Sequence, residues 1–551
     1  MVYPQIPLAQ SIILLSKQKN IRHIVISPGS RNAPLTIGFT ADNYFTCYSI
    51  VDERCAAFFA LGIAQQTKQP VIVVCTSGSA LLNYYPAVAE AFYAHIPLIV
   101  ISADRPKHKI DIGDGQTIRQ ENVFANHSLY NANLTEQAGI ENDAHFCKAI
   151  DTAIANKGPV HINVPFEEPL YNIVNSPSVE IYSNTYINDR ITDKFDIFPF
   201  VETWNKTSKK LIIFGENSPN TINANILEKL SKDPSVVVLS EKNSNIHHKA
   251  IFDKIDQLIT PFTDEDFEHF RPELLITIGG MLVSKRIKTY LRKYTPKQHW
   301  HINPLCAYDT FGCLTHHIKV EANTFFKLLF NQKTISVDSN YQNAINQLNT
   351  LRIQKHNKFI ETAPYSDLTV FGKICELLPQ NIHLQISNSS PIRYVQLFDL
   401  HPSIEIFCNR GTSGIDGSTS TAIGASIFNP KPTILITGDI SFFYDSNALW
   451  NNYIPTNFKI IIINNSGGGI FRILPGHQKN ETFSTYFETQ HNLEAGYLAQ
   501  MYHFDYHIID QYSCLEDALK NFFSTTTKTI LEIKTPTEVN DLVLKNYFEY
   551  L

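Results

Sequence analysis

The sequence lacks the features that mark several classes of protein. Its nine cysteines are scattered singly, with no C-x-x-C pair. This pattern argues against a zinc module or a disulfide framework and favours a reducing compartment. No uninterrupted apolar run approaches the roughly 18 residues that a membrane-spanning helix needs. The formal net charge of -6 provides no overall basic field, so bulk electrostatics do not support binding to nucleic acid or to a membrane surface. Any anion site must therefore be built locally.

What remains is the composition of a globular chain. Hydrophobic residues make up 43% of the 551 positions and charged residues 18%, a normal ratio for packed domains. The usual domain size of about 150 residues suggests three or four domains. The start, MVYPQIPLAQSIILLSKQKN, has no basic n-region, and Gln and Ser interrupt its apolar positions. It indicates a helix rather than a signal peptide, and we expect a cytoplasmic protein.

Short apolar runs alternate with helical patterns along most of the chain. The first third contains the runs HIVIS, PVIVVC and PLIVIS, and similar runs follow in the middle third and in the last third. Runs buried on both faces and linked by helices are typical of parallel sheets. Polar segments at about residues 175–196 and 340–359 are plausible connectors. We predict three consecutive α/β domains with mostly parallel central sheets, at residues 1–180, 181–360 and 361–551.

Unusual residues gather where these predicted strands end. Ligands of open parallel sheets bind at the carboxyl ends of the strands. The motifs at these ends are SPGSR, TSGSA and SADRP in the first region, IGGMLVSKR in the second, and SNSS, NRGTSGIDG, TGDIS and NNSGGG in the third. The functional surface is therefore expected along the same edge of each sheet.

Two strand ends in the third region carry hard oxygen ligands. Asp439 follows the run PTILITG, and Asn465 ends FKIIIINN, with Gly467 shortly after it. A carboxylate, a side-chain carbonyl and a backbone carbonyl suit Mg²⁺ that is completed by phosphate oxygens and water. The glycines let backbone N–H groups approach a diphosphate closely. A lone G-D pair is more often an ordinary helix cap. G-D, a helix and then N-N roughly 25 residues later resembles the diphosphate–magnesium motif of thiamine diphosphate (ThDP) enzymes.

Such a cofactor also needs a glutamate from another segment. A carboxylate that hydrogen-bonds the aminopyrimidine ring stabilises the imino tautomer that removes the thiazolium C2 proton. The segment YSIVDERCAAFFALGIAQ offers Glu53 between a strand and a helix. The alternative is that Asp52 and Glu53 only cap the helix and complement its dipole. The Asp439 pattern elsewhere favours the catalytic role.

Eight motifs in order along the chain resemble the SEPHCHC synthase family of ThDP enzymes, which act in menaquinone biosynthesis. They are ISPGSRNAPL, VDER, TSGSALLNYYPAVAEA, SADRP, QTIRQ, NRGTSGIDGSTSTAIG, GDISFFYDSNAL and NNSGGGIF. The resemblance spans almost the whole chain and is weakest in the middle third. It implies a transferase that decarboxylates 2-oxoglutarate on ThDP and adds the resulting succinyl carbanion to isochorismate. The products would be 2-succinyl-5-enolpyruvyl-6-hydroxy-3-cyclohexene-1-carboxylate (SEPHCHC) and CO₂.

The resemblance also implies which residues hold the cofactor and the metal. For ThDP they are Glu53, Ile415, Gly438, Asp439, Ile440, Asn465 and Gly467, and for Mg²⁺, with Mn²⁺ as a substitute, they are Asp439, Asn465 and Gly467. Ile415 resembles the bulky apolar residue that props ThDP into its bent shape; the alternative is an ordinary core isoleucine.

The two implied substrates together carry four carboxylates, so their site needs several fixed cations, preferably arginine. The cations at positions matching the family are Arg31, Arg105, Lys285, Arg286, Arg393 and Arg410. Each alone is more often a surface side chain than a ligand, and their shared place at strand ends favours the binding role. By the same matching, Ser30, Gln116 and Ser389 would supply neutral hydrogen bonds, or else would only form turns and caps. Ile470 and Phe471 would form an apolar wall that limits water. Gly115 stands where some relatives have Asn, so a contact made by that Asn side chain is not expected here.

Two other functions remain open at this point. Another ThDP enzyme, a 2-oxoacid decarboxylase or an acetolactate-type synthase, would keep Glu53, Asp439 and Asn465 but has less use for the arginines. A non-catalytic nucleotide- or ThDP-binding protein would explain the glycine turns but not the glutamate paired with a distant metal motif. The resemblance further implies a homodimer or a dimer of dimers, in which the first domain of one subunit and the third of another form each active site.

Overall fold

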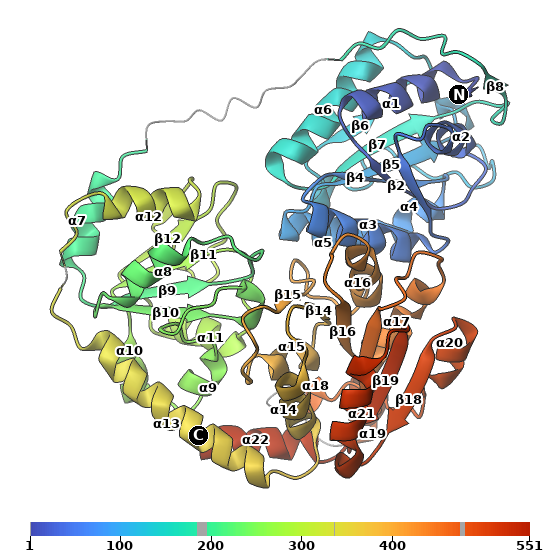
Figure 1. Ribbon diagram of the computed structural model, residues 1–551. Helices are drawn as coiled ribbons and strands as arrows, with labels where there is room; N and C mark the ends of the chain where they lie inside the picture. Colours follow the sequence, from blue (N-terminus) through green and yellow to red (C-terminus); the bar gives the residue numbers. More distant parts are fainter. Residues whose placement is uncertain (1, 184–194, 336, 474–479) are drawn as a thin grey trace.

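Three parallel sheets follow one another along the residues that the computed structural model describes, which are 2–183, 195–335, 337–473 and 480–551 (Figure 1). The first sheet contains β2 His23–Ile26, β3 Thr46–Ser49, β4 Val71–Cys75, β5 Leu98–Asp104, β6 Asn131–Asn133 and β7 Val160–Pro165. The middle sheet contains β9 Lys210–Phe214, β10 Val236–Ser240, β11 Leu274–Ile278, β12 Gln298–Ile302 and β13 His316–Ile318. The third contains β14 His383–Ile386, β15 Glu405–Phe407, β16 Thr433–Gly438, β17 Lys459–Asn464, β18 Asp505–Ile509 and β19 Thr529–Lys534. The predicted α/β fold with mostly parallel sheets is confirmed.

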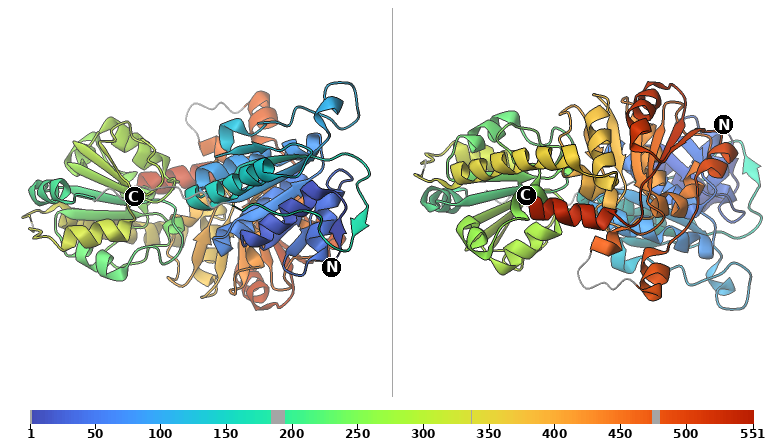
Figure 2. Two further views of the ribbon diagram at one scale, coloured as in Figure 1. Left: turned by 90° about the horizontal axis from the view of Figure 1, so that it is seen from above. Right: turned by 90° about the horizontal axis from the view of Figure 1, so that it is seen from below.

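Helices cover both faces of each sheet (Figures 1 and 2). Those of the first region are α1 Pro7–Gln18, α2 Ala33–Ala41, α3 Glu53–Thr67, α4 Ser79–Asn83, α5 Tyr85–Ala94 and α6 Ile140–Asn156. Those of the middle region are α7 Phe198–Lys206, α8 Ala224–Ser231, α9 Ile255–Ile259, α10 Asp264–Phe270, α11 Lys285–Lys293 and α12 Ala322–Phe330. The remainder are α13 Tyr341–Thr362, α14 Asp367–Leu377, α15 Ser390–Val395, α16 Ser418–Ser426, α17 Asp439–Tyr444, α18 Ile470–Ile473, α19 Glu481–Phe483, α20 Gly496–Met501, α21 Tyr512–Ser524 and α22 Asn540–Tyr550.

The predicted boundaries between the three domains stay predictions. Residues 184–194 of the first polar connector lie outside the described residues. The second connector is largely helix α13, a 22-residue helix that runs from the middle region to the third (Figure 2). His356 of α13 contacts the Tyr547 hydroxyl of α22, with 2.8 Å between Nδ1 and the oxygen. Lys355 donates to the carbonyl oxygen of Leu551. These contacts join the middle region to the chain's last helix.

The first and third sheets have the same strand order. The first runs β3-β2-β4-β5-β7-β6 and the third β15-β14-β16-β17-β19-β18, and every neighbouring pair is parallel. In each sheet the order reverses beside the first strand, between β2 and β4 or between β14 and β16. The middle sheet, β10-β9-β11-β12-β13, reverses between β9 and β11. Such reversal points open a crevice at the carboxyl ends of the strands.

Helices α3 and α16 join the first region to the third by direct backbone contact. Gly62 of α3 lies so near α16 that a Cβ there would stand 2.2 Å from the carbonyl oxygen of Thr421. A Cβ on Gly424 of α16 would stand 2.0 Å from the carbonyl oxygen of Phe59. Real side chains do not tolerate such distances, so both positions require glycine. The apolar residues of both helices belong to one buried core.

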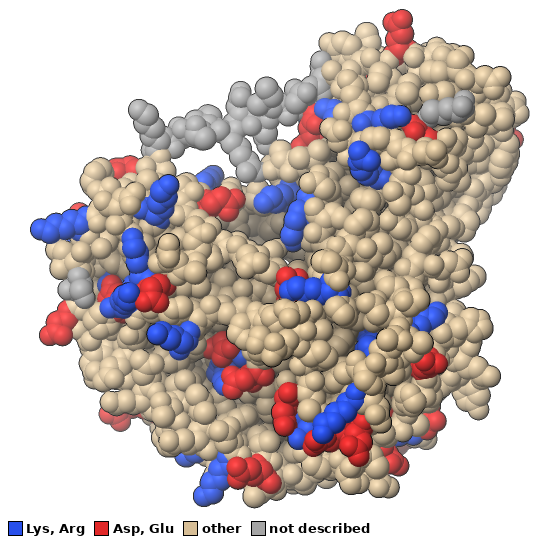
Figure 3. Space-filling model, in the orientation of Figure 1, with Lys and Arg blue, Asp and Glu red and all other residues tan. Residues whose placement is uncertain are grey.

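The charged side chains on the surface, like the composition, show no strong excess of one sign. On the face shown in Figure 3, Lys and Arg side chains are interspersed with Asp and Glu rather than gathered in one basic patch. None of the helices in the described part of the chain is both long and apolar enough to cross a bilayer.

Candidate active site

Some of the residues predicted for the site follow the strands that flank two of the three reversal points. Ser30 and Arg31 follow β2, and the turn at Ser77 follows β4. In the third sheet, Ser389 follows β14, and Asp439 comes directly after β16. Because both sheets have the same order, these residues stand at equivalent strand ends of the two sheets.

Asp439 is buried and tied to the next strand end. Its Oδ2 atom accepts a hydrogen bond from the N–H of Gly467 at 2.9 Å, and its Oδ1 accepts from the N–H of Ile440 at 2.7 Å. The structure thus brings together three predicted cofactor residues around one carboxylate. His491, which the sequence patterns did not indicate, places Nε2 3.3 Å from the same Oδ2.

Asn465 presents a carbonyl oxygen that lacks a partner. Its Nδ2 donates to Oδ2 of Asp367 at 3.0 Å, whereas Oδ1 is buried without a hydrogen-bond partner among the described residues. Leaving such an oxygen unpaired costs free energy. Asp367 also accepts from the Thr535 hydroxyl at 2.5 Å, and burial raises the pKa of Asp367 to about 6. Asp367 therefore fixes the amide so that Oδ1 is free for a ligand.

The backbone around these side chains is open on one side. A Cβ on Gly438 would find only Pro391, at 4.0 Å, which means that space lies above this strand end. Gly467 has φ of +147°, and a Cβ there would meet the carbonyl oxygen of Glu488 at 2.6 Å. A side chain is therefore excluded at Gly467 and would fit at Gly438.

Glu53 begins helix α3 in a half-buried position. Burial raises the pKa of its carboxyl group, with a smaller contribution from Asp52. The capping role belongs to Asp52, whose Oδ1 accepts from the N–H of Cys55 at 3.2 Å. Asp52 also accepts from Asn447 of the third region at 2.9 Å. Because the neighbour caps the helix, the Glu53 carboxyl is not needed for that purpose.

Two arginines of the first region lie on either side of the turn after β4. The backbone N–H of Arg31 donates to Thr76 Oγ1 at 3.3 Å. The Nη1 of Arg105 donates to Ser77 Oγ at 2.7 Å and to the carbonyl oxygen of Gln116 at 2.9 Å. The structure therefore brings together three residues expected to bind substrate.

The guanidinium of Arg31 is largely engaged by the chain itself. It donates to the carbonyl oxygen of Phe166 and to Oε1 of Glu168, both at 3.0 Å. Its Nε is buried without a hydrogen-bond partner among the described residues. Ser30, the preceding residue, is exposed.

A second pair of arginines joins the third region to the middle one. Arg410 donates to Oδ1 of Asn388 at 2.7 Å and to the carbonyl oxygen of Leu282 at 3.2 Å. Arg393 approaches the carbonyl oxygen of Val283 at 3.5 Å, and its buried Nε lacks a hydrogen-bond partner within the described chain. Burial and the neighbouring Arg410 lower the pKa of Arg393. The unpaired Nε of Arg393 and the repulsion between the Arg393 and Arg410 guanidinium groups suit an anion bound between these two side chains.

The cations predicted on helix α11 are both exposed. Glu241, a buried carboxylate, accepts from the backbone N–H groups of two residues just before this helix and so fixes its start. The guanidinium of Arg286 lies over the ring of Phe548, 4.5 Å from its centroid. Lys285 is beside it. Arg286 is thus packed against α22, and both Arg286 and Arg393 face the carboxyl group of Asp256.

The remaining predicted residues lie close to these groups in the chain. Ser389 has φ of +73°, a conformation that serine rarely adopts and that often marks functional turns. Ile415 is half-buried, and its carbonyl oxygen accepts from Ser441 at 2.6 Å, two residues beyond Asp439. Ile470 and Phe471 begin helix α18, and the Phe471 ring is 36% exposed.

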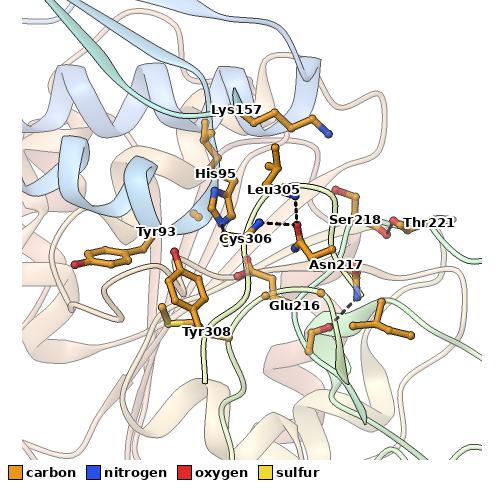
Figure 4. Close-up of a pocket in the computed structure, with 18 of the residues that line it drawn as sticks. Tyr93, His95, Lys157, Glu216, Asn217, Ser218, Thr221, Leu305, Cys306 and Tyr308 are labelled. Atoms are coloured by element: carbon orange, nitrogen blue, oxygen red, sulfur yellow. Dashed lines mark hydrogen bonds between the residues drawn. The ribbon is translucent and has the colours of Figure 1, made fainter. Parts of the chain in front are cut away.

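A cavity of about 670 Å³ lies at the third reversal point, in the middle sheet (Figure 4). Its walls include Glu216 after β9, Gly279 after β11 and the segment that carries Cys306 and Tyr308. Burial and the neighbouring Glu90 raise the pKa of Glu216 to about 8. None of the predicted site residues is among the residues that line this cavity, although Leu282, whose carbonyl oxygen accepts from Arg410, is one of them.

Known proteins resemble the chain over its whole length. The family model "Thiamine pyrophosphate enzyme, N-terminal TPP binding domain" matches residues 6–127, and "Thiamine pyrophosphate enzyme, C-terminal TPP binding domain" matches residues 391–533. The chain is 63% identical to the 2-succinyl-5-enolpyruvyl-6-hydroxy-3-cyclohexene-1-carboxylate synthase of Flavobacterium psychrophilum, with 100% of both chains covered. The synthases of Flavobacterium johnsoniae and Christiangramia forsetii are 60% and 49% identical, also with 100% coverage of both chains.

The chain belongs to the SEPHCHC synthase family.

This family member is therefore a ThDP enzyme, because thiamine pyrophosphate is thiamine diphosphate. Glu53 falls within the N-terminal match, and Asp439, Asn465 and Gly467 fall within the C-terminal one. The strand ends of the third sheet fit a metal-bound diphosphate on structural grounds. They combine a buried carboxylate, the unpaired Oδ1 of Asn465 and the open space above Gly438. These are hard oxygen donors beside a space free of side chains.

Proposed function

We propose that this SEPHCHC synthase family member decarboxylates 2-oxoglutarate with ThDP and transfers the resulting succinyl group to isochorismate by conjugate addition. The products are SEPHCHC and CO₂, in menaquinone biosynthesis. The observation that carries the proposal within the family is the pairing of the arginines. Arg31 and Arg105 contact the turn after β4, and Arg393 and Arg410 lie where the third region meets the middle one. Four guanidinium groups match the four carboxylates of the two substrates.

The residues at the third sheet would hold the metal and the diphosphate. Asp439, the Oδ1 of Asn465 and the backbone carbonyl of Gly467 would coordinate Mg²⁺, which Mn²⁺ can replace. Gly438 and Ile440 would contact the cofactor beside them, and Ile415 would support its bend. Bound ThDP supplies the electron sink for decarboxylation. Asp367 would act indirectly, by holding the amide of Asn465 in place.

Glu53 would hold a proton at the ring nitrogen of the aminopyrimidine. A carboxyl group whose pKa is raised by burial keeps its proton in a hydrogen bond more readily than an exposed one. The arginines would orient the substrate carboxylates, with Ser30, Gln116 and Ser389 as neutral partners and Lys285 and Arg286 at the periphery. Ile470 and Phe471 would exclude water from the reacting carbon.

We also propose a homodimer, or a dimer of dimers, with each active site formed between subunits. Large apolar side chains of the third region are exposed in the single chain. Tyr444 at the end of α17 is 54% exposed, Trp450 53% and Tyr497 of α20 86%. A surface of this composition is typical of protein interfaces. The nine cysteines are all free, which supports a cytoplasmic location.

The direct test is to incubate the purified protein with ThDP, Mg²⁺, 2-oxoglutarate and isochorismate and to search for the adduct by mass spectrometry. SEPHCHC, formed together with CO₂, is the expected result. Release of CO₂ with no adduct would support a 2-oxoacid decarboxylase instead. Binding of ThDP without turnover of either substrate would contradict any catalytic role.

A further inference from the structure

A strand of the middle sheet and the loop after it bring a histidine, a carboxylate and a thiol together. His299 lies in β12, whereas Asp309 and Cys313 lie in the loop of residues 303–315 that leads to β13. One potential ligand atom from each lies within 4.8 Å of the others. Within the described part of the chain, no second group of three such residues meets this criterion. The structure therefore places a mixed set of nitrogen, oxygen and sulfur donors at one point.

His299 carries the second observation that points to a ligand. Its side chain is fully buried, with an exposure of 0%, and its Nδ1 has no hydrogen-bond partner among the described residues. Its other ring nitrogen, Nε2, is engaged by the hydroxyl of Thr277 at 2.8 Å. An unpaired buried nitrogen is costly unless something fills its lone pair or accepts its proton. A metal ion would do so.

Thr277 can set the ring in the form that a metal needs. Its hydroxyl also lies 2.8 Å from Nδ1 of the buried His301. The hydroxyl of Thr277 can donate a hydrogen bond to this nitrogen. Its oxygen then accepts a hydrogen bond from the Nε2–H of His299, which leaves the lone pair on Nδ1 of His299. A hydrogen bond of this kind to the distal nitrogen is the usual support of a metal-bound histidine.

The other two residues have free ligand atoms. Oδ1 of Asp309 accepts from the N–H groups of Cys313 and Leu314, at 2.8 and 3.0 Å, so the carboxylate is oriented while Oδ2 remains available. Asp309 is exposed, and Cys313 is half-buried. Metal ions can therefore enter from solvent, and water can complete the coordination. Binding would displace the thiol proton of Cys313.

We propose that His299, Asp309 and Cys313 form a binding site for one Zn²⁺ ion per chain. Thiolate, imidazole and carboxylate are the ligands that zinc takes in proteins, whereas Mg²⁺ prefers oxygen alone. Zinc bonds of about 2.0 to 2.3 Å place tetrahedral ligands roughly 3.3 to 3.8 Å apart, so a closure of the loop by at most about 1.5 Å brings the three ligand atoms to the metal. The site is not a paired-cysteine module, which the scattered cysteines exclude. It is built from residues that meet only in the folded chain.

The bound zinc would fix one wall of the cavity in Figure 4. The loop that carries the proposed ligands Asp309 and Cys313 also lines that cavity, through Leu305, Cys306 and Tyr308. Cys306 contacts His95 of the first region, with 3.2 Å between Sγ and Nε2. Zinc would therefore hold the loop against β12 at the place where the middle region faces the first.

The test uses the full-length protein, first stripped of metal with a chelator. It is then supplied with ThDP and excess Mg²⁺, which fill the proposed magnesium site, and with Zn²⁺, passed through gel filtration and analysed for metal. One zinc per chain is expected to remain. Cys313→Ser should lower the zinc affinity by about 100-fold, because the substitution removes a metal ligand and not merely a residue that orients one. Cys306→Ser, in the same loop but outside the group, is the matched control and should retain zinc.

Cobalt separates this site from the proposed magnesium site. Co²⁺ bound to a thiolate gives a near-ultraviolet charge-transfer band, which Co²⁺ on oxygen ligands lacks. The band should appear in the unaltered protein and in Asp439→Asn, and it should vanish in Cys313→Ser. Zinc should also raise the melting temperature of the unaltered protein and not that of Cys313→Ser. No zinc retained, or a band that survives in Cys313→Ser, would overturn the proposal, and neither outcome depends on enzyme activity.

Discussion

Oδ2 of Asp439 accepts the backbone N–H of Gly467 at 2.9 Å, so the ends of β16 and β17 are tied together by the carboxylate itself. The two strands are neighbours and parallel. The side chain proposed to bind magnesium is therefore already oriented by the polypeptide. Little reordering remains to oppose metal binding, which is the advantage of a preorganised site.

Asp439→Asn should abolish Mg²⁺-dependent ThDP binding while preserving the fold. Asparagine can still accept the N–H of Gly467, but it removes the only charge among the three proposed ligands. We expect ThDP affinity to fall by about 100-fold or more, beyond the 10- to 100-fold typical of supporting residues. Calorimetric titration of ThDP at several Mg²⁺ concentrations measures this. Unchanged affinity at low Mg²⁺ would contradict the proposed ligand role.

Glu53→Gln should bind ThDP and yet lose most turnover. Asp52 caps helix α3, so the substitution leaves the helix start intact. Loss of a proton-transfer group typically lowers the rate by about 10² to 10⁴. Steady-state kinetics and ThDP titration of the same preparation separate the two effects. As a control, Asp52→Ala should cost about 1 kcal/mol of stability through the lost cap. Full activity in Glu53→Gln would remove Glu53 from the mechanism.

Asp367 should make the metal-free protein less stable as the pH rises. Burial raises its pKa in the folded protein from the ordinary value of 3.8 to about 6, so its contribution is present below pH 3.8 and is lost as the pH rises through about 6. This difference corresponds to roughly 3 kcal/mol as an upper bound. Asp367→Asn should therefore show a weaker fall in stability between pH 4 and 7, measured by urea unfolding. Asp445, whose pKa burial also raises to about 6, remains in both proteins. An equal fall in stability with pH in the unaltered protein and in Asp367→Asn would show that Asp367 does not titrate in this range.

Arg393→Lys should weaken substrate binding more than catalysis of bound substrate. The Nε of Arg393 is buried without a hydrogen-bond partner in the described chain, so this guanidinium has donors left for a carboxylate. Lysine keeps the charge but loses the planar pair of donors. We expect the KM for one substrate to rise by about 10-fold, which corresponds to one charge-assisted hydrogen bond. Lys293→Ala, at an exposed position in the last turn of helix α11 and outside the proposed site, is the control and should change KM little.

Mixing inactive chains tests whether the active site lies between subunits. Glu53→Gln and Asp439→Asn chains are purified separately, then unfolded and refolded together. With random pairing about half of the dimers contain both chains, and one of their two sites is intact, so roughly a quarter of the normal activity should return. Sites formed within a single chain would give no recovery.

The fold could be predicted because its signal is local. Strands such as β4 and β16 are apolar and buried on both faces, and this composition is visible in the sequence. The strand ends could be located for the same reason, since their glycines and polar residues interrupt those runs. The equal order of the first and third sheets has no residue-level repeat behind it and required the structure.

The supporting residues could not be predicted from local patterns. Asp367 stands at the start of α14, where it has the pattern of an ordinary helix start, and it meets Asn465 only through the fold. His491 follows no strand end, although it lies 3.3 Å from Asp439. The strand-end motif SNSS drew attention to the segment that contains Asn388, but no sequence pattern indicated the hydrogen bond between Asn388 and Arg410. Contacts between residues far apart in sequence decide such positions.

The glycine contact between α3 and α16 determines how closely these two helices approach each other. A single methyl group on Gly62 or Gly424 would collide with a carbonyl oxygen of the opposite helix. Helix α3 begins at Glu53, and α16 packs against β16, which ends at Gly438, one residue before Asp439. An alanine at either glycine must then push the two helices apart, so one carbon atom far from any substrate can displace Glu53 and Asp439 of the same chain, which would serve two different sites of the proposed dimer.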